Sequence, residues 1–92
     1  MKQILTDKQM QFLDILLIHK ELCGVEIVEK SNGKLGRGAT FAIATNFEEL
    51  GIIESFVEKV AQKRIPRRFY SVTEKGKRFY DTVKELDQKT DR

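Results

Sequence analysis

The sequence predicts a winged helix-turn-helix, a mainly α-helical α+β fold with the order helix, helix, helix, strand, strand, helix. Three observations support this prediction. Three helix-like segments occupy the first half of the chain, two strand-like runs separated by a proline-containing segment follow, and an amphipathic helix comes last. A third helix that leads into a two-stranded hairpin, or wing, is the arrangement of a winged helix-turn-helix.

The composition is that of one small globular domain. The chain has 92 residues, of which 40% are hydrophobic and 34% are charged, and we take residues 1–92 as a single domain. One cysteine excludes an intramolecular disulfide, and no apolar run exceeds four residues, too few to cross a membrane. The first ten residues lack the apolar core of a signal peptide. We therefore expect a soluble, cytoplasmic protein.

The first predicted helix covers residues 5–21. Thr6 is a favourable N-cap, and Gln9 completes a capping-box pattern. Its apolar residues occupy more than one side of the helix: Met10, Phe12, Leu13, Ile15, Leu16 and Leu17. A helix of this kind needs burial on several faces, which in a small domain indicates a subunit interface.

The second and third helices are predicted on either side of a glycine-rich turn. The second begins near Gly24 and stops at Asn32–Gly33, and the third covers residues 39–51 and ends at Gly51. The predicted inner face of the third helix consists of Thr40, Ile43, Ala44, Phe47 and Leu50. The opposite face carries mainly small or polar side chains, Ala42, Thr45, Asn46 and Glu49.

Two strands, residues 52–60 and 67–73, are predicted to form the wing, which spans about residues 57–72. Pro66 lies between them, as expected of a residue that cannot donate to a sheet ladder. Thr73 then caps a last helix of about residues 73–88, a possible dimerisation element. Its apolar stripe consists of Phe79, Tyr80, Val83 and Leu86.

The wing segment from residue 59 to residue 68 contains five basic residues and no acidic one. Such a run is often only a solvated loop, but behind a helix-turn-helix it favours phosphate binding. We expect Lys63, Arg64 and Arg67 to contact DNA phosphates. Arg68 shares a strand face with Tyr70, so packing against the core is the alternative for it.

The third helix supplies the other candidate DNA contacts. Lys34 and Arg37 flank its start, where free amide groups and the helix dipole favour a phosphate; solvation of the turn is the alternative. Asn46 is able to hydrogen-bond adenine, and Thr45 and Ala42 are able to contact a thymine methyl. The alternative is that these three are ordinary surface residues.

Other chemistry has less support. His19 and Cys23 have a four-residue spacing that suits one helix face, but two ligands are too few for a structural zinc site. Phe69 and Tyr70 could stack on single-stranded bases, although one ring of such a strand pair is usually in the core. No catalytic constellation appears, and we expect no enzyme activity, metal or cofactor.

Three stretches resemble the PadR family of winged-helix transcriptional regulators, over roughly Thr6 to Leu86. The family's Gly-Tyr-Glu-Ile motif is matched at Gly24, Glu26 and Ile27. Its Gly-Thr-Leu-Tyr-Pro run and the Leu-Glu-rich continuation are matched at Gly38, Phe41, Glu48, Glu49, Gly51 and Ile53. Its Pro-Arg-Arg-Tyr-Tyr-x-Leu-Thr-x-x-Gly motif is matched at Pro66, Arg67, Arg68, Tyr70, Thr73 and Gly76. Val25, Ala39, Thr40 and Ala42 depart from the family pattern.

Together, the residues and the resemblance predict a sequence-specific regulator that binds double-stranded DNA. We expect a repressor that acts as a homodimer on an inverted-repeat operator, without an identified effector. Two alternatives remain open: a winged helix that binds another protein, and a nonspecific nucleic-acid-binding protein.

Overall fold

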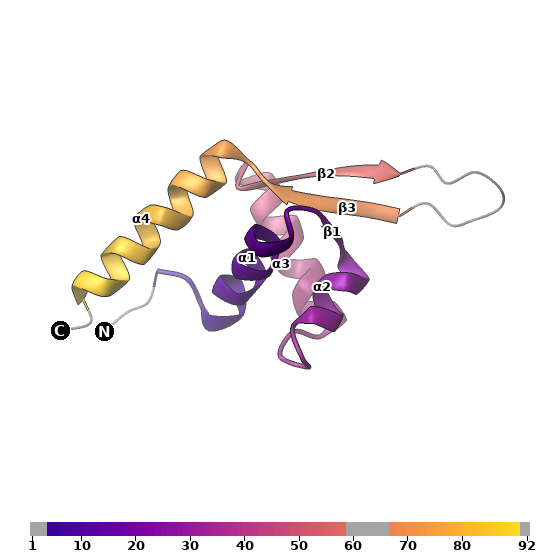
Figure 1. Cartoon of the computed structure of the whole chain (residues 1–92), viewed down its shortest axis with the longest axis horizontal. Coiled ribbons are helices and arrows are strands. Elements are labelled where there is room, and N and C mark those ends of the chain that lie inside the picture. The colour runs from indigo at the N-terminus through magenta and orange to yellow at the C-terminus, as the bar shows by residue number, and fades with distance from the viewer. Residues whose placement is uncertain (1–3, 59–66, 91–92) are drawn as a thin grey trace, which may run out of the picture.

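The structure, a computed structural model, describes residues 4–58 and 67–90, which form four helices and a small antiparallel sheet. In chain order the elements are α1 (Asp7–His19), β1 (Leu22–Cys23), α2 (Gly24–Lys30), α3 (Arg37–Glu49), β2 (Ile53–Glu58), β3 (Arg67–Val72) and α4 (Glu74–Thr90). The β2–β3 hairpin projects from one side of the helices, and α4 extends from the opposite side (Figure 1). This arrangement confirms the predicted winged helix-turn-helix and adds one strand, β1.

Helix α1 begins at the predicted capping box. The Gln9 backbone N–H donates to Thr6 Oγ1 at 3.1 Å, and the Thr6 backbone N–H donates to Gln9 Oε1 at 2.9 Å. The helix lies against α2, α3 and β3. Four of its apolar side chains are buried: Phe12, Leu13, Ile15 and Leu16. Elements of the same chain therefore bury α1 on several faces. These four side chains give no support for the subunit interface expected from the sequence.

Strand β1 is absent from the sequence-based prediction, because two residues are too short to show an alternating pattern. Leu22 pairs with Tyr70 and Cys23 pairs with Phe69, which gives the sheet order β1-β3-β2. The strand also separates His19, the last residue of α1, from Cys23, the N-cap residue of α2. The two residues therefore do not share one helix face. A metal or redox pair at this four-residue spacing would need a shared face.

The turn between α2 and α3 is held by one buried serine. The Ser31 hydroxyl donates to the Val28 carbonyl at 2.7 Å and accepts from the Leu35 N–H at 3.0 Å. Asn32 and Gly33 have φ angles of 55° and 85°, a left-handed conformation that asparagine and glycine adopt most readily. The predicted stop of the second helix at Asn32–Gly33 is confirmed.

Helix α3 packs one face on the core. Four of the five residues predicted for this face are buried: Thr40, Ile43, Ala44 and Phe47. Leu50, the fifth, is the C-cap residue and is 52% exposed, so its placement on the inner face was wrong. Phe47 packs edge-on against Phe12 with ring centroids 5.8 Å apart. Gly51 follows with a φ angle of 78° and ends the helix as predicted.

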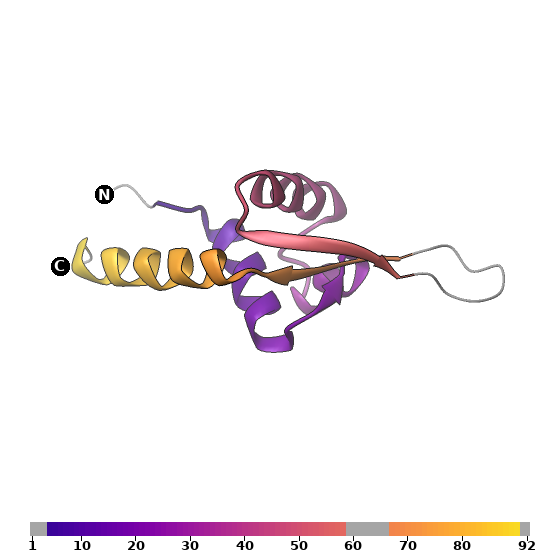
Figure 2. The same ribbon diagram turned by 90° about the horizontal axis from the view of Figure 1, so that it is seen from above.

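The wing is an antiparallel hairpin with a continuous register. β2 and β3 pair from Ile53 opposite Val72 to Glu58 opposite Arg67. Because side chains alternate along a strand, Arg68 and Tyr70 share the face that also carries Ser55. The predicted tip, residues 61–66, lies outside the described residues, as do residues 59 and 60 of the predicted first strand. Figure 2 shows that the hairpin and α4 point in opposite directions from the helices.

The start of α4 is bonded to the turn that precedes β2. The Thr73 hydroxyl accepts from the Gly76 N–H at 2.9 Å, which confirms the predicted cap, and donates to the Gly51 carbonyl at 2.7 Å. Gly76 lies so close to the residue before β2 that a Cβ atom there would be 2.0 Å from the Ile52 carbonyl oxygen. Helix α4 therefore leaves the sheet at a fixed position.

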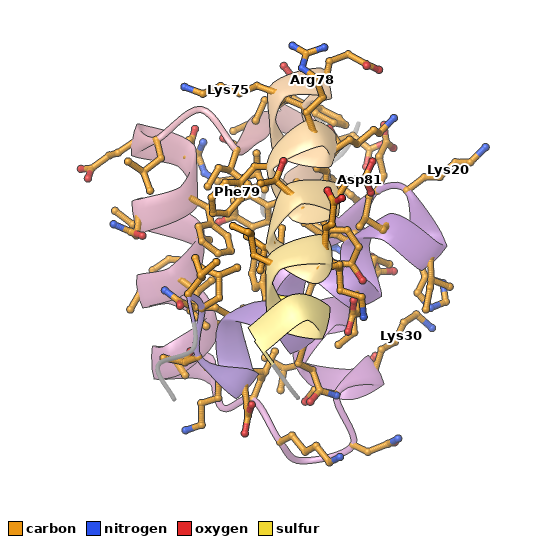
Figure 3. All side chains as sticks on the ribbon, turned by 90° about the vertical axis from the view of Figure 1, so that its left-hand side faces the viewer. Lys20, Lys30, Lys75, Arg78, Phe79 and Asp81 are labelled. Carbon is orange, nitrogen blue, oxygen red and sulfur yellow. The ribbon has the colours of Figure 1, made fainter. Side chains whose placement is uncertain are left out.

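The predicted apolar stripe of α4 is buried only in part. Val83 is buried, Phe79 and Tyr80 are partly buried against the core, and Leu86 is 42% exposed. Phe79 lies on the side of α4 that faces α3, whereas Arg78 points away from the helices (Figure 3). Within residues 4–58 and 67–90, no helix combines the length and apolar character needed to span a membrane.

Candidate nucleic-acid interface

The start of α3 presents backbone amide groups next to two cations. Gly36 occupies the N-cap position and supplies no side-chain cap, so the first amide groups of the helix have no side-chain acceptor there. Arg37 is the first helical residue, and Lys34 lies in the preceding turn; both are exposed. Free amide groups, the positive end of the helix dipole and two cations together suit an anion such as a phosphate.

The outer face of α3 carries the three predicted base-reading residues. Ala42, Thr45 and Asn46 are all exposed, as expected for residues opposite the buried face. The structure adds Phe41, which is 69% exposed and is not among the predicted contact residues. Its spacing is the signal for it: Phe41 stands four residues before Thr45 and therefore shares its helix face.

The hairpin contributes cations from β3. Arg67 and Arg68 are both exposed at the start of this strand. Lys63 and Arg64, the other two predicted phosphate contacts in the wing, lie outside the described residues. The described part of the hairpin also contains acidic residues. One of them, Glu58 of β2, lies directly opposite Arg67 in the strand register.

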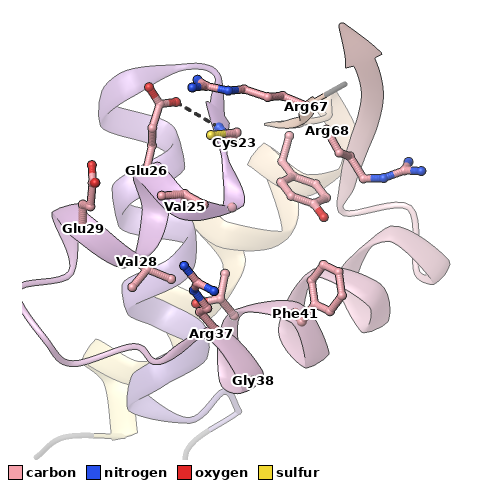
Figure 4. Close-up of a pocket in the computed structure, with 13 residues that line it drawn as sticks. Cys23, Val25, Glu26, Val28, Glu29, Arg37, Gly38, Phe41, Arg67 and Arg68 are labelled. Atoms are coloured by element: carbon pink, nitrogen blue, oxygen red, sulfur yellow. Dashed lines mark hydrogen bonds between the residues drawn. The ribbon is translucent and has the colours of Figure 1, made fainter. Parts of the chain in front are cut away.

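A groove of about 790 Å³ joins α3 to the hairpin. Arg37 from α3 and Arg67 from β3 both line it, so cations that are far apart in the sequence lie at one site (Figure 4). Phe41 and Val25, each more than half exposed, supply apolar surface. The remaining lining residues are Cys23, Gly24, Glu26, Val28, Glu29, Gly38, Thr40, Arg68 and Tyr70.

The acidic residues of the groove come from α2. Glu26 Oε1 accepts a hydrogen bond from the Cys23 backbone N–H at 3.0 Å, so this carboxylate caps α2 (Figure 4). Glu29 lies one turn further along the helix and is exposed. The three arginines outnumber the two carboxylates of the lining, and the groove is therefore cationic.

Arg68 is bonded across the wing and does not pack into the core. Its Nη1 donates to Ser55 Oγ at 3.0 Å, and Ser55 Oγ donates to Glu48 Oε2 at 2.6 Å. Glu48 lies in the last turn of α3. The core-packing alternative considered for Arg68 is wrong, because its side chain is exposed and hydrogen-bonded to β2.

Tyr70 belongs to the core and not to a stacking surface. Its side chain is 4% exposed, and burial raises its pKa above 10.0, with Arg68 lowering and Glu48 raising it to smaller extents. Phe69, on the opposite strand face, stacks on Phe56 with ring centroids 5.7 Å apart. This confirms that one ring of the pair is in the core.

Several solved structures with the same fold are described as transcription regulators, whereas no protein-family model and no curated protein matches the sequence significantly. A PadR family transcription regulator from Clostridium difficile R20291 is 20% identical, with a TM-score of 0.78 over 94% of this chain and 92% of that chain. A PadR family regulator from Eggerthella lenta DSM 2243 is 19% identical, with a TM-score of 0.74 over 87% and 70%. A transcriptional regulator from Clostridium thermocellum is 18% identical, with a TM-score of 0.72 over 96% and 92%. The chain therefore has the winged helix-turn-helix fold that these regulators share, PadR family members among them.

Proposed function

We propose that the chain is a transcription regulator of the PadR family that binds double-stranded DNA and has no enzyme activity. The main observation is that Arg37 of α3 and Arg67 of the hairpin line one cationic groove beside the exposed face of α3. A duplex offers phosphates on both sides of its major groove, so a protein that inserts α3 there needs cations on both elements.

In this proposal the two elements have different roles. The exposed face of α3, with Ala42, Thr45 and Asn46, contacts base edges. Lys34 and Arg37 bind a phosphate at the start of α3, and Arg67, together with Lys63 and Arg64, binds phosphates beside the hairpin. Phosphate contacts position the protein, and base contacts determine the preferred sequence.

We further propose that the protein is a cytoplasmic repressor that acts as a homodimer on an inverted repeat. A two-fold axis would place two α3 helices in successive major grooves if they lie about 34 Å apart. The exposed Leu86 on the apolar side of α4 supports dimerisation through this helix. Bound to a promoter, such a dimer would exclude the transcription machinery from the same DNA.

Selection of binding sites from random duplex DNA tests this function. We expect a consensus with two-fold symmetry, and we expect Arg37→Ala and Arg67→Ala to weaken binding to every duplex. Arg78→Ala is the matched control, because Arg78 is an exposed arginine on α4, away from the groove (Figure 3). Retention without a consensus would show nonspecific binding, and no retention at low salt would contradict DNA binding.

A protein-binding winged helix is the second candidate. It is favoured by Phe41 and Val25, which place exposed apolar surface in the groove where a DNA-binding protein needs mainly polar contacts. The same selection separates the two functions. A protein-binding domain would not show the loss of duplex affinity that we expect for Arg37→Ala.

A further inference from the structure

Three elements meet in one chain of hydrogen bonds at the end of α3. Glu48 of α3 accepts from Ser55 of β2 at 2.6 Å, and Ser55 accepts from Arg68 of β3 at 3.0 Å. The hairpin is thus bonded to α3 through its first strand. Arg68 also lines the groove, together with Arg37 from the first turn of α3 and Arg67 from β3.

The position of Glu48 has a cost that the fold alone does not explain. A carboxylate in the last turn of a helix opposes the helix dipole, and α3 has no basic residue in that turn. A carboxylate also repels DNA phosphates when it lies near the proposed interface. The bond to Ser55, and through it to Arg68, is the favourable interaction that Glu48 makes in the described structure.

Arg68 has hydrogen-bonding capacity beyond this network. A guanidinium group carries five N–H donors, and the bond to Ser55 uses one of them. Arg67 and Arg68 leave β3 in different directions, Arg67 toward Glu26 and Arg68 away from it (Figure 4). Arg68 is therefore oriented by Ser55 while it remains exposed and close to α3.

We propose that Arg68 is a further DNA-phosphate contact and that Glu48 is a positioning residue, which acts on Arg68 through Ser55. This inference rests on the proposed DNA-binding function and deepens it. A hairpin that moved freely would find phosphates on any sequence. A hairpin held to α3 reaches its phosphates only when α3 lies correctly in the major groove, so the network raises the preference for the selected site over other DNA.

The experiment compares affinity for the selected site with affinity for a shuffled duplex of equal length. We expect Ser55→Ala to lower this affinity ratio about two- to tenfold, the usual effect of removing one hydrogen bond. The salt dependence of binding to the selected site should fall by about one unit, because Arg68 would no longer neutralise its phosphate. Ser55→Thr keeps the hydroxyl and should retain both values.

Two further variants separate positioning from general charge or stability effects. Glu48→Ala should lower the affinity ratio, because it removes the oxygen that accepts from Ser55. Glu49→Ala, the matched control, removes the same charge from the next residue and should change both affinities alike. Ser55→Ala and Arg68→Ala should be non-additive when combined, because they break one network. Thermal unfolding confirms that each variant is folded.

The outcomes distinguish this inference from the function on which it rests. A natural protein that binds both duplexes equally overturns sequence-specific DNA binding, and the positioning role with it. A natural protein that prefers its selected site, with folded Ser55→Ala and Glu48→Ala variants that keep the same ratio and salt dependence, overturns only the positioning role. Additive effects of Ser55→Ala and Arg68→Ala overturn it as well.

Discussion

Asn46 lies on the exposed face of α3, one turn beyond Ala42. If it reads an adenine edge, Asn46→Ala should cost about 1–3 kcal/mol of binding free energy at the selected site. The loss on random DNA should be small, because such contacts depend on sequence. Fluorescence anisotropy with both duplexes measures the difference, and an equal loss on both would make Asn46 a backbone contact or a structural residue.

Tyr80 connects α4 to α1 through a hydrogen bond from its hydroxyl to Asp14 Oδ1. Burial, and then this bond, raises the pKa of Tyr80 from 10.0 to about 12. Because the folded-state pKa lies above the unfolded one, this contribution to stability is complete below about pH 10 and is lost as the pH rises toward 12.

Tyr80→Phe should therefore lower the free energy of unfolding by about 1 kcal/mol at neutral pH. Its stability should also fall less than that of the natural protein between pH 10 and pH 12. Urea denaturation over this pH range measures both. Part of the loss of stability at high pH should remain in both proteins, because burial raises the pKa of Tyr70 as well. If the free energy of unfolding changed with pH in the same way for the variant and the natural protein, the Tyr80 hydroxyl would not titrate as described.

At the scale of elements, the first turn of α4 packs closely against the backbone before β2. Among the glycines, Gly76 has the least room for a side chain. A methyl group at Gly76 would lie 2.0 Å from the Ile52 carbonyl oxygen, which is backbone and cannot move aside alone. Gly76→Ala should cost about 1–3 kcal/mol of unfolding free energy. Gly38→Ala is the control, because no atom lies within 4 Å of its Cβ position, and alanine should favour α3 there. Equal unfolding midpoints for the two variants would contradict this.

The hairpin is expected to act as a unit on DNA phosphates. Changing Lys63, Arg64 and Arg67 together to alanine should weaken binding to all duplexes alike, because phosphate contacts carry no direct sequence information. The salt dependence should decrease by about one unit for each phosphate that the variant no longer neutralises. Titrations at several salt concentrations test this, and an unchanged slope in a folded variant would mean that the hairpin does not bind phosphate.

At the scale of the whole molecule, we expect the protein to form a dimer. Sedimentation at micromolar concentration should give about twice the monomer mass of 10.7 kDa. Leu86→Glu should shift the protein toward monomer, because it places a charge on the half-exposed apolar side of α4. A natural protein that remains a monomer, free and on DNA, would contradict the dimer and leave binding to one half-site.

The local features of this fold were predictable from the sequence, and the nonlocal ones were not. Thr6, Gly51 and Thr73 mark element boundaries by chemistry that involves only neighbouring residues, and all three predictions are confirmed. β1 exists because β3 pairs with it, and no property of two residues reveals that. The bond from Arg68 to Ser55 likewise depends on the hairpin register.

The pairing of β1 with β3 also has a consequence for the order of folding. The β2–β3 hairpin joins neighbouring segments, whereas Leu22 and Tyr70 come from the first and last quarters of the chain. Closing the longer loop costs more chain entropy, and contacts of this kind form slowly. We expect the helix-turn-helix and the hairpin each to form early and to dock late, so the groove shared by Arg37 and Arg67 is among the last surfaces to assemble.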